Sequence, residues 1–245
     1  MNPRLTFATT LRVLEQLRHD PRTIALLILV PVVLEALVKW VFLDRDQVFQ
    51  RVGVPLLGIF PLTSMFLVTS ITMLRERTSG TLERLLTTPM GKFDLLAGYA
   101  LGFGAIAVVQ GATVSLVAFG LLGLEVEGPV ALVLVFAVLN ALVGTCLGLL
   151  VSAFARSEFQ AVQFMPAFLL PQFLLSGLLA PREQMARALE VLSDFLPMTY
   201  AYDALARVAA GQGFEGHVAG DAAILLAVTL ASLALGSATL RRRTS

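Results

Sequence analysis

Six long apolar stretches follow one another along the chain, and short polar segments separate them. Each stretch has about the 20 apolar residues that a transmembrane helix needs to cross a bilayer. The pattern therefore predicts an all-α polytopic membrane protein with six transmembrane helices, at residues 24–43, 52–74, 95–122, 130–154, 159–179 and 222–240. Because the connections are short, residues 1–245 are expected to form a single transmembrane domain.

Two segments outside the apolar stretches show helical spacing of their own. In residues 1–22, Phe7, Leu11 and Leu14 recur on one face, which predicts an amphipathic helix in the membrane interface; a polar tail is the alternative. Residues 180–220 contain two short helical segments, which predict a helical hairpin before the last span.

Pairs of glycines in two of the stretches predict close helix packing. Gly98 and Gly102 lie in the third stretch, and Gly144 and Gly148 lie in the fourth. Small residues four positions apart share one helix face, where a second helix backbone can approach closely.

The loop at residues 75–94, between the second and third stretches, has its own helix signals. Gly80 is expected to end the incoming helix, Thr81 to supply the N-cap, and Pro89 to stop a short new helix. Its spacing fits a helix lying on the membrane surface and equally a docking element for another protein.

The short helix predicted in this loop has two different sides. Leu82, Leu85 and Leu86 share one face because they follow i, i+3, i+4 spacing, whereas Glu83 and Arg84 lie away from it. The leucine face is expected to bind apolar surface, and the charged edge to remain accessible.

Composition and charge agree with a membrane protein and predict its orientation. The chain is 57% hydrophobic and only 14% charged, whereas soluble domains are roughly a quarter charged. Lys and Arg concentrate in residues 1–22, in the loop at 75–94 and at 241–243, whereas acidic residues dominate the other connections. The positive-inside rule therefore predicts cytoplasmic termini, a cytoplasmic loop at 75–94 and an extracellular hairpin at 180–220. No signal peptide is expected, because charges precede the first apolar stretch.

Four polar residues inside the predicted spans are candidates for a substrate path. Glu35 and Lys39 are four residues apart and can pair on one helix face, although Lys39 can also reach the interface. Charged groups within a span are costly and are functional candidates, so an ion-coupled carrier that works through Glu35 is one alternative. Gln163 and Gln172 lie in a polar, proline-containing fifth span that is expected to face protein or a pathway.

The sequence offers no constellation for catalysis or metal binding. Both histidines, His19 and His217, fall outside the predicted spans, and Cys146 is the only cysteine. Gly91-Lys92 lacks the preceding glycine and the following Ser or Thr of a phosphate-binding loop. We therefore expect no enzyme activity, no catalytic residues, no metal site and no cofactor on this chain.

Two motifs resemble those of a known family. Residues 75–89, RERTSGTLERLLTTP, resemble the cytoplasmic signature of ABC type-2 (ABC-2) exporter permeases, closest to the antibiotic- and multidrug-resistance and nodulation-type members. Ser176-Gly177, Pro181 and the run at 195–207 are similar to the extracellular hairpin of that family. Residues 180–183 are more charged than the family pattern, which leaves the bounds of the hairpin open.

The resemblance implies a permease subunit that works with other chains. Such permeases form dimers, here a homodimer or a pair with a paralogous permease, in the lipid of the cell membrane. A separate ABC ATP-binding subunit holds ATP and magnesium, and no nucleic-acid partner is expected. The loop at 75–94 would be the coupling helix seated in a groove of that subunit, and the substrate path would run along the first, second and fifth spans. The coupling residues that this implies are Arg75, Arg77, Gly80, Thr81, Leu82, Glu83, Arg84, Leu85, Leu86 and Pro89.

The resemblance also suggests the class of cargo. It favours export of a lipophilic compound, a drug or a lipid-like substrate, with polysaccharide or glycolipid export as an alternative. One Trp and three Tyr offer few side chains for stacking on sugars. A membrane scaffold that uses the same loop for docking without transport is a further alternative.

Overall fold

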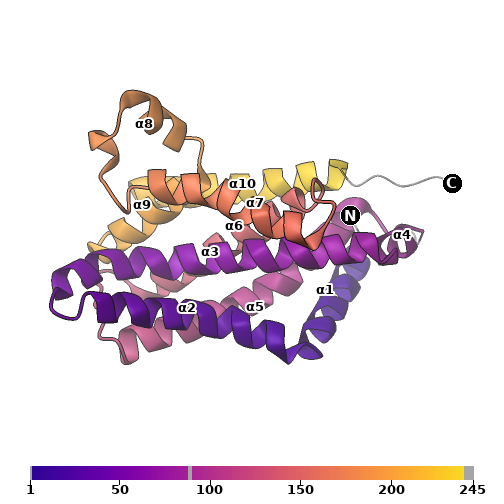
Figure 1. Cartoon of the computed structure of the whole chain (residues 1–245), viewed down its shortest axis with the longest axis horizontal. Coiled ribbons are helices and arrows are strands. Elements are labelled where there is room, and N and C mark those ends of the chain that lie inside the picture. Colours follow the sequence, from indigo (N-terminus) through magenta and orange to yellow (C-terminus); the bar gives the residue numbers. More distant parts are fainter. Residues whose placement is uncertain (1, 88–89, 240–245) are drawn as a thin grey trace.

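The computed structural model describes residues 2–87 and 90–239, except the side chain of Leu86 (Figure 1). The predictions at Pro89, residue 240 and residues 241–243 therefore lie outside the described residues. The described part is helical and contains no strand. Five of its helices are long and apolar enough to cross a membrane: α2 (Pro21–Val41), α3 (Asp46–Thr78), α5 (Lys92–Gly120), α6 (Val130–Val151) and α10 (Gly216–Thr239). The all-α membrane class is thus confirmed.

The fifth predicted span corresponds to α7 (Glu158–Leu175), which is not one of these five helices. It has 18 residues and contains Pro166 and Pro171. Glu158 and its three glutamines lower its mean hydropathy. A crossing by α7 therefore stays a prediction.

Helix α3 extends beyond its predicted span at both ends. Its 33 residues correspond to about 50 Å of helix, whereas the hydrocarbon core of a bilayer is about 30 Å thick. The polar turns at both ends of α3 can therefore lie outside the hydrocarbon without breaking the helix. This places residues 75–78 on a rigid extension of the helix.

Helices α3 and α6 form the centre of the bundle and approach each other at the predicted glycines. A Cβ atom added to Gly144 would lie 2.1 Å from the Leu62 carbonyl oxygen, and one on Gly148 would lie 2.2 Å from Thr69 Oγ1. Thr69 Oγ1 also donates a hydrogen bond to the Thr145 carbonyl at 3.2 Å. The close approach predicted for this glycine pair is confirmed.

The glycine pair of α5 packs against α1 (Pro3–Arg18) rather than against another long helix. A Cβ atom on Gly98 would lie 2.5 Å from Thr9 Cβ, and one on Gly102 would lie 2.8 Å from Val13 Cγ1. Thr10 Oγ1 also donates to the Gly98 carbonyl at 3.2 Å. Helix α1 is therefore held directly on the bundle.

The buried face of α1 differs from the predicted stripe. Phe7 and Leu11 are 61% and 51% exposed, whereas Val13 and Leu17 are buried together with threonines on the same side. The threonine methyl groups pack against apolar neighbours, and the threonine hydroxyls donate hydrogen bonds to backbone carbonyls. This face can therefore be buried although its residues are classed as polar. The apolar stripe is left facing outward, as an interfacial helix requires.

The two ends of the bundle carry different short helices (Figure 1). Helix α4 (Thr81–Leu86) lies near the N-terminus and near the end of α10, and we refer to this as the α4 end. A hairpin made of η1 (Arg182–Gln184), α8 (Arg187–Ser193) and α9 (Pro197–Ala209) lies at the opposite end.

The hairpin is held to the bundle through α9. Met198, Ala201 and Leu205 are fully buried in the largest apolar cluster, which α3 and α6 also line. Within the hairpin, Arg182 pairs with Asp194, and Thr199 Oγ1 donates to the Ser193 carbonyl at 2.8 Å. Short helices are thus present within 180–220, as the spacing predicted.

Candidate functional site

Helix α4 begins directly after a left-handed turn at Gly80. The φ of Gly80 is 75°, a conformation that glycine adopts without the steric cost of a Cβ atom. The N-cap prediction for Thr81 is wrong, because Gly80 occupies the capping position and Thr81 is the first helical residue. The Thr81 hydroxyl instead lies 3.0 Å from Ser79 Oγ.

The leucine side of α4 packs on the protein itself. Leu82 is 5% exposed and belongs to an apolar cluster with Val13 and Leu17 of α1 and Met73 of α3. Leu85 is partly buried against the same cluster. The Leu86 side chain lies outside the described residues.

The charged edge of α4 faces away from this cluster. Glu83 and Arg84 are both exposed, whereas the preceding Leu82 is buried. The Thr87 hydroxyl donates to the Arg84 carbonyl at 2.7 Å, within the same turn. The short helix therefore has one face fixed to the bundle and one edge available to another molecule.

Three consecutive residues at the end of α3 connect α4 to the rest of the bundle, and we call Arg75, Glu76 and Arg77 the junction. Arg75 binds Glu158, the first residue of α7, through Nε–Oε1 at 2.7 Å and Nη2–Oε2 at 3.0 Å. This two-point bond between guanidinium and carboxylate fixes direction as well as distance. It lowers the pKa of Glu158 below its ordinary value.

Glu76 connects α3 to α1 and α5. Its carboxylate is buried, and Oε1 accepts hydrogen bonds from Arg12 Nη1 and Gln16 Nε2, each at 3.1 Å. Arg12 also donates to the Tyr99 hydroxyl at 2.5 Å, and its guanidinium lies 5.4 Å from the centre of that ring. Sequence reasoning missed this role of Glu76, although its position between two arginines of the motif was a signal.

Arg77 connects α3 to the end of α6. Its Nη1 donates to the Ser152 carbonyl at 2.6 Å, and Ser152 is the C-cap residue of α6. Successive side chains of an α-helix point roughly 100° apart, so three neighbouring residues can contact three different helices. The junction thereby joins the base of α4 to α1, α5, α6 and α7.

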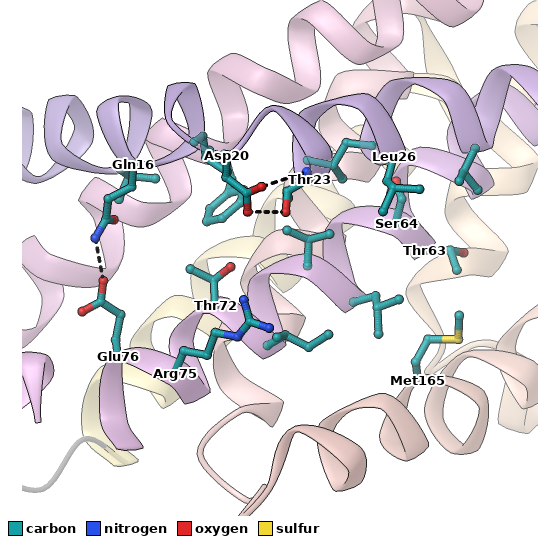
Figure 2. Close-up of a pocket in the computed structure, with 18 of the residues that line it drawn as sticks. Gln16, Asp20, Thr23, Leu26, Thr63, Ser64, Thr72, Arg75, Glu76 and Met165 are labelled. Carbon is teal, nitrogen blue, oxygen red and sulfur yellow. Dashed lines mark hydrogen bonds between the residues drawn. The ribbon is translucent and has the colours of Figure 1, made fainter. Parts of the chain in front are cut away.

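A cleft of about 720 Å³ opens between α1, α2, α3 and α7 (Figure 2). Its α4 end is lined by the charged residues Asp20, Arg75 and Glu76. The remaining lining is predominantly apolar and comes from all four helices and from α5, with Leu17, Leu26, Val30, Leu67, Val68, Phe103 and Met165 among its members. Figure 2 shows Arg75 extending into the opening between Thr72 and Thr23. The cleft is thus polar at one end and apolar along its length.

Asp20 sits at the polar end of this cleft, in the connection between α1 and α2. The Thr23 hydroxyl donates to its Oδ2 at 2.6 Å and the Thr23 N–H donates to its Oδ1 at 3.2 Å, which caps α2. These bonds stabilise the carboxylate and lower the pKa of Asp20 below its ordinary value. Asp20 therefore carries a negative charge at neutral pH.

Of the two alternatives for Lys39, pairing with Glu35 or reaching the interface, the structure shows the second. Lys39 Nζ lies 2.5 Å from Asp46 Oδ1, across the turn between α2 and α3, and 4.7 Å from the Phe49 ring centre. The flexible lysine side chain extends toward the end of α2, where its ammonium group binds the exposed carboxylate of Asp46. Glu35 is fully buried, and neither of its oxygens has a hydrogen-bond partner within the described part of the chain.

None of the four predicted substrate-path residues lines the cleft. Gln172 is buried and donates to the Phe168 carbonyl of its own helix at 3.1 Å, and Gln163 is exposed. Met165 is the residue that α7 contributes to the cleft instead. The helices that line the cleft nevertheless include the first, second and fifth predicted spans.

An interhelical contact that the sequence did not reveal lies beside the cleft. Gln110 of α5 donates from Nε2 to the Leu27 carbonyl of α2 at 2.7 Å and to Ser64 Oγ of α3 at 2.8 Å. An amide that bonds two neighbouring helices fixes their spacing. A buried Gln within an otherwise apolar stretch was the available signal.

Comparison with known proteins identifies the family. The profile described as ABC-2 type transporter matches residues 4–209. The inner membrane transport permease YhhJ of Escherichia coli is 31% identical over 150 residues, which are 60% of this chain and 40% of that protein. The linearmycin resistance permease protein LnrN of Bacillus subtilis is 30% identical over 171 residues, 69% of this chain and 44% of that protein.

A eukaryotic protein is also similar. The ABC transporter G family member 20 of Dictyostelium discoideum is 30% identical over 138 residues, 56% of this chain and 19% of that protein. This chain therefore matches less than half of the length of each of these curated relatives. The profile match covers most of the chain and includes α4, the junction and the cleft, and on this evidence the chain belongs to the ABC-2 type transporter family.

Proposed function

We propose that the chain is the transmembrane permease subunit of an ATP-driven exporter of lipophilic compounds, drugs or lipid-like molecules. A separate ABC ATP-binding subunit would bind ATP and magnesium, and a second permease, identical or paralogous, would complete the transporter. The observation that carries the proposal is α4, whose leucine face is fixed to the bundle while Glu83 and Arg84 remain exposed.

The junction supports a coupling role for α4. A displacement of α4 acts on the last turn of α3, and from there on α1, α5, α6 and α7 through the bonds of Arg75, Glu76 and Arg77. Three of these helices, α1, α5 and α7, line the cleft. A short helix with one fixed face can therefore transmit a push from a partner to the walls of the cleft.

The proposal includes six spans, with α7 as the fifth, and a cytoplasmic α4 end. The start of the described chain and the end of α10 both lie near α4 (Figure 1). Two ends on the same side of a membrane require an even number of crossings, so a crossing by α7 would complete the five other spans to six. The basic residues within 2–22 and 75–87 lie there too, which supports a cytoplasmic position by the positive-inside rule. In this arrangement the hairpin at 180–220 is extracellular and residues 1–245 act as one permease domain.

The apolar lining of the cleft favours lipophilic cargo over polysaccharide. Pockets for small molecules typically have volumes of about 300–1,000 Å³, mostly apolar walls and a few polar groups. The cleft, at about 720 Å³, fits that description. Two relatives are named a linearmycin resistance permease and a probable multidrug ABC transporter permease, which agrees with the export of drugs.

Reversing charge on the exposed edge of α4 tests the proposal. We expect Glu83→Arg to reduce both co-purification with the ABC ATP-binding subunit and ATP-driven dye uptake into inverted vesicles, each about tenfold. The reason is that the variant places a positive charge where the proposed contact has a negative one. The matched control is Glu15→Arg, an exposed carboxylate of α1, which should change neither. Normal complex formation and transport in Glu83→Arg would refute the coupling role, and complex formation without any ATP-driven transport in the unaltered chain would favour a scaffold.

A further inference from the structure

The charges at the polar end of the cleft do not balance. Asp20, Arg75 and Glu76 line it. Arg75 is neutralised by its two-point bond to Glu158, and Glu76 by its ion pair with Arg12. Asp20 has no Lys or Arg within salt-bridge distance in the described part of the chain, and its oxygens are held by uncharged Thr23. The local excess is therefore one negative charge.

Glu76 adds a second carboxylate at the same place. Its side chain is 7% exposed, and both of its hydrogen bonds are accepted by Oε1. Oε2 has no hydrogen-bond partner among the residues that the structure describes. Burying a carboxylate oxygen without a donor costs free energy, so a positive charge close to Glu76 at this end of the cleft is favoured.

The shape of the cleft fits a molecule with one charged end. The carboxylates lie where α1 ends and α3 ends, whereas the walls toward α2 residues such as Val30 and Leu34 are apolar. An apolar body can occupy the long part while a donor group reaches the carboxylates. A cation is the chemical class whose charge complements the excess.

We propose that the cleft binds an amphiphilic amine, with its ammonium group at Asp20 and Glu76 and its apolar body along α2 and α3. This deepens the proposed function, because it rests on the cleft being the export path and names the cargo class. Neutral lipophiles would bind more weakly, and anionic ones most weakly, because they would meet Asp20 and would have to displace Glu158 from Arg75.

The test is binding of three twelve-carbon probes to the full chain in phosphatidylcholine nanodiscs at pH 7. Dodecylamine is cationic, dodecanol neutral and dodecanoate anionic, and binding to empty nanodiscs is subtracted. We expect dodecylamine to bind about tenfold more tightly than dodecanoate, and dodecanol with an affinity between the two. A tenfold difference in affinity is about what one charge-assisted hydrogen bond contributes. Equal affinity for the three probes would overturn the proposal.

Two variants locate the charge. Asp20→Asn should weaken dodecylamine binding about fivefold and leave dodecanol unchanged, because Asn caps a helix as well as Asp does and α2 stays intact. Glu158→Gln frees Arg75 and should weaken dodecylamine while strengthening dodecanoate. The control Glu15→Gln, on the exposed side of α1 and outside the cleft, should alter none of the affinities. Unchanged dodecylamine binding in Asp20→Asn would place the amine elsewhere and overturn the proposal.

Further arms separate the source of the amine and the dependence on the proposed function. If phosphatidylethanolamine in the nanodiscs competes with dodecylamine, the amine chemistry is supported with a lipid headgroup as a source; without competition, a non-lipid amphiphile is supported. ATP-driven export of lipophiles without any preference for amines would leave the permease proposal standing and reject this one. A preference for amines without ATP-driven transport would reject the permease proposal and leave the amine site in the cleft standing.

Discussion

Gly80 is the residue on which the start of α4 depends. Its positive φ turns the chain out of α3, and a Cβ atom added there would meet nothing within 4 Å. Any effect of substitution is therefore a backbone effect rather than a clash. The flexible stem of Lys39 likewise lets its ammonium group bind Asp46 of the next helix rather than Glu35.

Substitution of Gly80 is predicted to separate conformation from packing. Gly80→Val should destabilise the turn by about 1–2 kcal/mol, whereas Gly80→Asn should be better tolerated because Asn adopts the left-handed region more readily. Both ATP-driven dye uptake and co-purification with the ABC ATP-binding subunit should fall in the Val variant and persist in the Asn variant. Equal behaviour of the two variants would show that the left-handed turn is not required.

At the scale of elements, the junction makes α4 part of a connected unit. Arg75, Glu76 and Arg77 each bond to a different helix or helix end, and Leu82 packs under α1. The bond between Arg75 and Glu158 is the contact that joins the α3 and α7 walls of the cleft at its polar end. Because both side chains are more than half exposed, this pair is expected to contribute to geometry more than to stability.

A charge exchange tests whether that contact transmits motion. Arg75→Glu and Glu158→Arg are each predicted to lower dye uptake several-fold while the partner's ATP hydrolysis continues, because like charges would separate α7 from α3. The double variant restores the pair in reverse and should recover most of the uptake. Melting temperature is the accompanying readout, and we expect it to change little in all three. Failure of the double variant to recover, with melting temperatures unchanged, would remove the ion pair from the coupling route.

At the scale of the whole molecule, the two ends of the bundle differ in kind. The α4 end gathers the junction, the polar end of the cleft and the charged edge of α4, whereas the other end carries the packed hairpin (Figure 1). A membrane-crossing bundle with these ends has one side suited to a soluble partner. The orientation then decides which compartment that partner occupies.

Cysteine labelling checks the orientation. Cys146 is fully buried and should be inert to a membrane-impermeant maleimide, so it serves as a silent background. A cysteine at exposed Arg84 should react in inverted vesicles and not in intact cells, whereas one at exposed Gln212 should do the opposite. Labelling of both positions from the same side would contradict the six-span topology.

The apolar stretches by themselves determined the helical membrane class and the approximate limits of most helices, because a span must satisfy its backbone internally over a fixed length. Local spacing also indicated the short helix after Gly80, with a leucine side and a charged side. The hydropathy pattern left the crossing of α7 open, because its glutamines and prolines lower the local signal.

Only the tertiary structure decided which distant residues meet. The threonine face of α1 packs on Gly98 and Gly102, and Glu76 accepts hydrogen bonds from Arg12 and Gln16. In every one of these contacts the partners are 60 or more positions apart in the sequence. The cleft likewise arose from four helices and excluded Glu35, Lys39, Gln163 and Gln172. Periodicity states which side of a helix is apolar, whereas the choice of neighbour depends on shape and charge contributed by other helices.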